Sequence, residues 1–65
     1  FELKIRANAI ADVQVIDLHG TPLEIKSKVS GTAQMGSKLA YGAYTIVVNY
    51  IDGTREEIKI IKSPN

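Results

Sequence analysis

The chain has 65 residues, a formal net charge of +1 and a hydrophobic content of 45%. This length suits one small domain, and a charge so close to zero gives no electrostatic footprint for nucleic acid. Cysteine is absent and His19 is the only histidine, which excludes disulfides and thiolate or multi-histidine metal sites. A membrane-spanning helix needs about 20 mostly apolar residues in a row, and the sequence has no such stretch. We expect a single domain over residues 1–65 with no cofactor, nucleic-acid partner or transmembrane segment.

Apolar and polar residues alternate with a period of two rather than 3.6, which indicates strands. Nine isoleucines and five valines agree with this, because β-branched side chains suit strands. In chain order the alternation predicts strands over 2–7, 12–15, 23–29, 44–50 and 57–60. The segment 31–42, rich in glycine, serine and alanine, is expected to cross irregularly, with a short strand from Ala33 to Met35. The pattern predicts an all-β fold, a small antiparallel β-sandwich (Ig-like or Greek-key-like) of six or seven short strands.

The last hairpin is defined by its turn and by its apolar pattern. A type I turn with Gly53 in the left-handed conformation pairs Tyr50 with Thr54 and sets Ile46 opposite Ile58. A register shifted by one residue would mix apolar and charged side chains on one face, so the apolar pattern selects this pairing. The same register predicts two further pairs, Tyr44 with Ile60 and Val47 with Glu57.

The hairpin that turns at Gly20 is expected to follow the same rule. Its register would set Val15 opposite Leu23 and Val13 opposite Ile25, with all four side chains facing the core. The intervening charged residues of the third strand, Glu24, Lys26 and Lys28, would then face solvent.

The residues whose side chains could take part in catalysis are better explained by structural roles. His19 lies one residue before a turn glycine, where a polar side chain points into water, and Asp17 is expected to cap that turn through an Asx hydrogen bond. Glu56 and Glu57 are adjacent in a strand and therefore point to opposite faces. We expect that the chain is not an enzyme.

The three tyrosines do not form an obvious stacking platform. Tyr44 and Tyr50 share the buried face of their strand, which leaves Tyr41 as the one exposed aromatic residue. Binding faces for bases or sugars generally combine several exposed aromatic residues. Lys59 and Lys62 are expected to face solvent, where lysines protect an edge strand.

Three segments, 13–20, 39–48 and 59–62, together and in this order resemble the C-terminal sorting domains of the type IX secretion system (the type A sorting domain family). The stretch from Val13 to Gly20 is similar to their V-x-V-aromatic/aliphatic-D-x-x-G segment. The stretch from Leu39 to Val48 is similar to their L-x-x-G-x-Y-x-V-x-V segment, and Lys59-Ile60-Ile61-Lys62 resembles their closing strand. The resemblance extends from Ala11 to Lys62.

The resemblance implies a sorting signal rather than an activity. A cargo protein carrying such a domain passes through the periplasm and is recognised by the outer-membrane translocon and its shuttle proteins. A cell-surface sortase often removes the domain, and the cargo reaches the cell surface or the medium. By this resemblance the partner-recognition residues are Asp17, Gly20, Tyr41, Gly42, Tyr44, Lys59, Ile60, Ile61 and Lys62.

Two other interpretations stay open. In the first, the chain is an accessory β-sandwich of an extracellular enzyme or adhesin and acts as a spacer or a ligand-binding module. In the second, it is an isolated sandwich with no biological role. Because it begins at Phe1 rather than methionine, we expect it to be a piece of a longer protein. The family resemblance implies that it is the C-terminal module of a longer secreted protein. Weak homodimers through an exposed edge strand are a further expectation.

Overall fold

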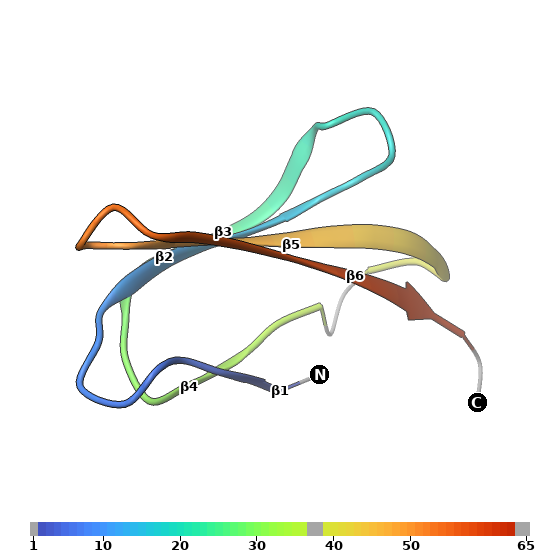
Figure 1. Cartoon of the computed structure of the whole chain (residues 1–65). Coiled ribbons are helices and arrows are strands. Elements are labelled where there is room, and N and C mark those ends of the chain that lie inside the picture. The colour runs from blue at the N-terminus through green and yellow to red at the C-terminus, as the bar shows by residue number, and fades with distance from the viewer. Residues whose placement is uncertain (1, 37–38, 64–65) are drawn as a thin grey trace.

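The computed structural model describes residues 2–36 and 39–63, and every regular element in these ranges is a strand (Figure 1). The elements are β1 (Glu2–Lys4), β2 (Ala11–Ile16), β3 (Pro22–Val29), β4 (Thr32–Gln34), β5 (Gly42–Tyr50) and β6 (Arg55–Lys62). The predicted all-β class is therefore confirmed, with six strands in the described part of the chain.

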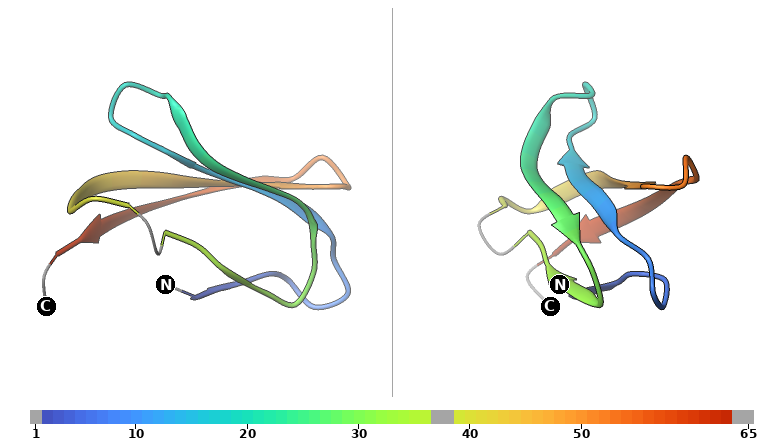
Figure 2. Two further views of the ribbon diagram at one scale, coloured as in Figure 1. Left: turned by 180° about the vertical axis from the view of Figure 1, so that it is seen from behind. Right: turned by 90° about the vertical axis from the view of Figure 1, so that its left-hand side faces the viewer.

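The strands form two antiparallel sheets that lie one above the other. The larger sheet has the order β3-β2-β5-β6, and the smaller one pairs β1 with β4. Figures 1 and 2 show the small sheet lying across one face of the large sheet. The short strand expected within the crossing is present as β4, where Ala33 pairs with Leu3 of β1. Positions 37 and 38 of that crossing lie outside the described residues.

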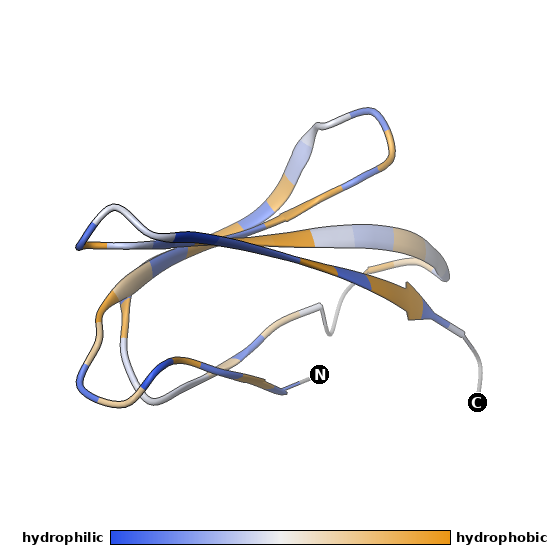
Figure 3. Ribbon diagram, in the orientation of Figure 1, coloured by the Kyte–Doolittle hydropathy of each residue, from blue (hydrophilic) through white to orange (hydrophobic). Residues whose placement is uncertain are grey.

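The core lies between the two sheets. The central strands β2 and β5 contribute four side chains that are at most 2% exposed, those of Val13, Val15, Ile46 and Val48. Leu3, Ile5, Ala33 and Met35 cover them from the segments of β1 and β4. Figure 3 shows the alternation of hydrophobic and hydrophilic residues along the strands that produces this one-sided burial.

The first strand is shorter than predicted. β1 ends at Lys4, and Ala7, which the alternation placed on the buried face, is exposed. The chain turns at Ala7 and Asn8, where Asn8 has a φ of +61°. Asparagine is one of the few residues that adopt this conformation readily. Ile5 still enters the core, and its N–H donates a hydrogen bond to the carbonyl of Gly31.

The β5–β6 hairpin has the predicted register. The Tyr50 N–H donates to the Thr54 carbonyl over 2.8 Å, and Gly53 has a φ of +94°. Ile46 lies opposite Ile58, and the remaining predicted pairs, Tyr44 with Ile60 and Val47 with Glu57, are also present.

The predicted register of the β2–β3 hairpin is wrong beyond its turn. The turn itself forms as expected, with Gly20 at a φ of +82° and the Asp17 N–H donating to the Thr21 carbonyl. Val15, however, lies opposite Glu24 and not Leu23. Pro22 explains the change: it has no N–H to continue the ladder, and the register shifts by one residue immediately after it.

The shift reverses the two faces of β3. Leu23 and Ile25 are 47% and 59% exposed, whereas Glu24 and Lys26 point toward the small sheet. There the Glu24 carboxylate accepts a hydrogen bond from the Gly36 N–H, and Lys26 Nζ donates to the Gln34 carbonyl. A second irregularity next to Lys28, whose φ is +55°, restores the inward direction, so Val29 packs against the core as predicted.

Candidate functional site

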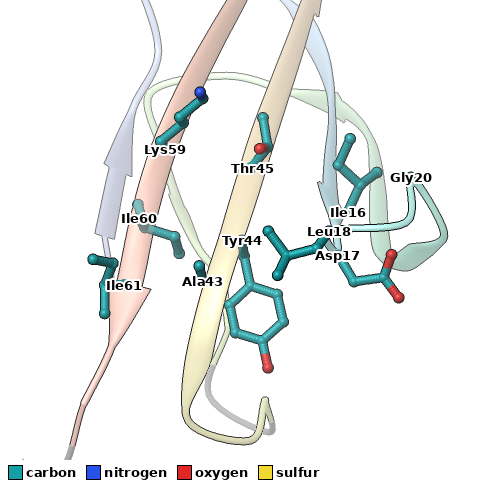
Figure 4. Close-up of a pocket in the computed structure, with 10 residues that line it drawn as sticks. All are labelled: Ile16, Asp17, Leu18, Gly20, Ala43, Tyr44, Thr45, Lys59, Ile60 and Ile61. Atoms are coloured by element: carbon teal, nitrogen blue, oxygen red, sulfur yellow. The ribbon is translucent and has the colours of Figure 1, made fainter.

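A groove of about 440 Å³ lies at the end of the large sheet where β2 ends, β5 begins and β6 ends (Figure 4). Residues from three separate parts of the chain line it: Ile16, Asp17, Leu18, Gly20, Ala43, Tyr44, Thr45, Lys59, Ile60 and Ile61.

Pairing between the strands brings these parts together. Thr45 lies opposite Ile16 on one side and opposite Lys59 on the other. Because neighbouring side chains along a strand point to opposite faces, these three point away from the face that Val15 and Ile46 bury in the core. Ile61 follows on the same face of β6, so these side chains stand on the side of the sheet that the small sheet leaves uncovered.

Two aliphatic side chains give the groove its apolar walls. Leu18, from the β2–β3 turn, and Ile61, from the end of β6, are each 81% exposed. The half-buried Ile16 and Thr45 lie between them. Figure 4 shows Leu18 and Ile61 on opposite sides of β5. Large aliphatic side chains exposed beside a concave surface are typical of a docking site.

The charged groups at the groove are Asp17 and Lys59. Asp17 Oδ1 accepts hydrogen bonds from the backbone N–H groups of His19 (2.8 Å) and Thr21 (2.9 Å), which confirms the predicted Asx turn. The bond from Thr21 is the main reason that the pKa of the Asp17 carboxyl lies below its ordinary value of 3.8, and His19 lowers this pKa further. Asp17 therefore fixes the turn that presents Leu18, while Lys59 is exposed.

Most of the recognition residues implied by the family resemblance meet at this groove. Six of the nine line it: Asp17, Gly20, Tyr44, Lys59, Ile60 and Ile61. Gly42 and Lys62 face each other in the adjoining pair of the β5–β6 ladder. Tyr41 lies next to Gly42 and is 67% exposed, as predicted.

Several of these residues also have structural roles. Tyr44 and Ile60 pack against the core, and Tyr44 Oη donates a hydrogen bond of 2.6 Å to the Ala40 carbonyl. The predicted solvent-facing position of Lys62 is wrong: its Nζ donates to the Gly36 carbonyl over 2.7 Å. Lys62 lies an odd number of residues from Lys59, so the two side chains leave β6 on opposite faces.

Four groove residues were not among the predicted recognition residues, namely Ile16, Leu18, Ala43 and Thr45. Leu18 carried a usable signal, because a large aliphatic residue between Asp17 and Gly20 is unusual in an exposed turn. Ile16, Ala43 and Thr45 gave no such signal, since each continues an ordinary strand.

The other residues considered for catalysis or metal binding lie where the sequence predicts. His19 is exposed, and the carboxylates of Glu56 and Glu57 form separate ion pairs, with Arg6 and Arg55 respectively. Within residues 2–36 and 39–63, no cluster of three or more histidine, aspartate or glutamate side chains is arranged to hold a metal ion. The same ranges contain no helix long and apolar enough to cross a membrane.

Comparison of the chain with models of known protein families, with curated proteins and with solved structures finds no match.

Proposed function

We propose that this chain is a non-catalytic C-terminal sorting domain that directs a cargo protein across the outer membrane through the type IX secretion system. Its partners are then the outer-membrane translocon, the shuttle proteins and the cell-surface sortase. The cargo passes through the periplasm and ends at the cell surface or in the medium.

One observation carries this proposal. The three segments that resemble the family are far apart in the sequence, yet each contributes side chains to one groove. Any hairpin can produce one such motif by chance, because turn glycines and alternating valines have structural uses of their own. A shared groove supports the proposal that the three motifs act together in recognition.

The chemistry of the groove suits recognition of a protein surface. Leu18 and Ile61 offer exposed apolar contact, and the cation of Lys59 lies beside them. Docking of this kind depends on a few apolar anchors in a concave site, with charged groups at the rim supplying specificity. A folded module can therefore carry the signal, and a cargo protein of any sequence can precede it.

Export of a reporter tests the proposal. The chain is fused behind a signal peptide and a fluorescent protein in a bacterium with a working type IX system and in a matched strain without one. We expect the reporter at the cell surface or in the medium only in the first strain. Retention in the periplasm of both strains, with the domain folded, would contradict the proposal.

The main alternative is an accessory β-sandwich that packs against a neighbouring domain. The bulge after Pro22 favours it, because it places Leu23 and Ile25 on the outer face of β3. Aliphatic side chains in such a position suit an interdomain contact. This alternative predicts that Leu23→Ser together with Ile25→Ser impairs the parent protein, whereas export of the reporter does not change.

A further inference from the structure

The outer edge of β6 is a regular row of backbone groups. β6 is the last strand of the large sheet, and its register with β5 runs without interruption from Arg55 to Lys62. The hydrogen bond from the Tyr50 N–H to the Thr54 carbonyl shows that the even-numbered residues of this hairpin bond across it. The N–H and C=O groups of residues 55, 57, 59 and 61 therefore point away from the sheet.

The opposite edge of the large sheet is less suited to adding a strand. β3 begins at Pro22, its register with β2 shifts twice, and Lys28 adopts a φ of +55°. Proline and bulges are common devices that interrupt edge pairing. Of the two edges of this sheet, β6 alone is continuous.

The side chains of β6 form a self-complementary pattern. Glu57 and Lys59 are both exposed on the outer face, with Ile58 between them on the other face. Ile58 is 39% exposed, although it lies on the side of the sheet that faces the core. An added strand would cover the exposed part of this side chain.

We propose that β6 pairs with β6 of a second copy of this chain, antiparallel and with the two-fold axis at Ile58. Glu57 then lies opposite Lys59 of the second copy, and Lys59 lies opposite its Glu57. The two Ile58 side chains meet on the inner face. The outward-pointing groups of residues 57 and 59 form the backbone hydrogen bonds, so an eight-stranded sheet runs through the dimer.

The charges select this register over its neighbours. The outward-pointing N–H and C=O groups of the two copies lie opposite one another only when the two-fold axis passes through a residue and not between two residues. Axes at residues 56, 57 and 59 set Glu56, Glu57 or Lys59 opposite its own copy, which is repulsive. An axis at residue 60 sets Lys59 opposite Ile61. Axes at residues 56 and 59 also pair opposite charges twice, Arg55 with Glu57 and Glu56 with Lys62 respectively, but each keeps one like-charged pair. The axis at Ile58 pairs opposite charges twice and sets no like charges opposite one another.

This inference goes beyond the proposed function and does not depend on it. An edge of eight residues buries less surface than the roughly 1,200 Å² of standard stable complexes, so the dimer is weak. Sedimentation of the purified chain measures it without any secretion assay. A failure of export would therefore leave this test intact.

Charge reversal provides the test, by sedimentation equilibrium at up to about 1 mM protein. Glu57→Lys alone and Lys59→Glu alone each set like charges opposite one another twice per dimer, so each variant should weaken dimerisation by about tenfold. The double variant Glu57→Lys/Lys59→Glu should restore dimerisation. An equimolar mixture of the two single variants should form heterodimers, because their strands carry opposite charges at both positions.

Lys4→Glu in β1 is the matched control, since it changes the net charge as Lys59→Glu does but lies in the other sheet. It should dimerise like the wild type, and circular dichroism should show every variant folded. A wild-type chain that stays monomeric throughout would overturn the proposal. Single variants that dimerise as the wild type does would also overturn it, because the contact would then lie elsewhere.

Discussion

Lys62 Nζ donates a hydrogen bond of 2.7 Å to the carbonyl oxygen of Gly36. This bond joins the end of β6 in the large sheet to the segment that follows β4 in the small one. Glu24 binds the N–H of the same glycine from β3, so side chains from both edges of the large sheet hold Gly36.

Loss of the Lys62 bond should lower stability. We expect Lys62→Met to reduce the free energy of unfolding by about 1 kcal/mol, because the Gly36 carbonyl loses a partner in a part-buried position. Lys59→Met, on the exposed face of the same strand, should change it by less than about 0.5 kcal/mol. Urea denaturation measures both. Equal effects at the two positions would show that the Lys62 contact contributes nothing particular.

The φ of Gly53 predicts a graded response to substitution. At +94° a β-branched residue is strained, so Gly53→Val should cost about 1–3 kcal/mol of unfolding free energy. Gly53→Asn should cost less, because asparagine tolerates positive φ better than other residues that carry a side chain. Space does not confound the comparison, since a Cβ atom added here meets no heavy atom within 4 Å. A melting temperature unchanged in the valine variant would be incompatible with this turn.

Truncation at the centre of the core should prevent folding. Ile46 is fully buried on β5 between β2 and β6. Ile46→Ala should cost about 2–5 kcal/mol, which is comparable to the whole stability of a domain of this size. Ile46→Val, at about 0.5–1.5 kcal/mol, should remain folded. Near-ultraviolet circular dichroism distinguishes the two, and a well-folded alanine variant would mean that the core is not centred here.

The two hairpin turns should make the chain sensitive to acid. Hydrogen bonds from Thr54 lower the pKa of Asp52, as the bond from Thr21 lowers that of Asp17. A carboxyl with a lowered folded-state pKa stabilises the fold at pH values above its unfolded value, here 3.8. That contribution is lost as the pH falls through the folded value. Stability should therefore decline as the pH is lowered below 3.8.

Urea titrations at a series of acid pH values measure this decline. The Asp17→Asn/Asp52→Asn variant keeps an oxygen acceptor at each turn but loses both ionisable carboxyl groups, so its stability should depend less on pH in the acid range. An identical pH dependence in the variant and the wild type would show that other groups cause the acid sensitivity.

The two hairpins show what the sequence could predict about the fold. Between Gly42 and Lys62 the pairing has no register shift, and the predicted apolar pairs, Ile46 with Ile58 and Tyr44 with Ile60, share the core face. Burial of that face was therefore enough to select the register, even though Val47 on the other face is also buried. In β3 the alternation of Leu23, Ile25 and Val29 is equally regular, yet two register shifts intervene. The second shift returns Val29 to the core. The alternation therefore gives no sign that, between the two shifts, the inward-facing and outward-facing residues of β3 are exchanged.

The groove was harder to predict than the fold. The family resemblance selected residues in all three of its segments, but could not separate Ile60 and Tyr44, which pack against the core, from Ile61, which is exposed. The opposite directions of Lys59 and Lys62 follow from strand parity alone. The bond from Lys62 to Gly36 does not, because it depends on where the small sheet lies.

The most direct test of the proposed function compares three aliphatic side chains that are equally exposed. Leu18 and Ile61 line the groove, whereas Ile51 lies in the β5–β6 turn, and each is 81% exposed. Glutamate at any of these positions should leave the fold intact, since little buried surface is lost. The measurement is the amount of exported reporter for each variant in the strain with a working type IX system. We predict that Leu18→Glu and Ile61→Glu abolish export and that Ile51→Glu exports like the wild type. Wild-type export by both groove variants would contradict a role of the groove in sorting.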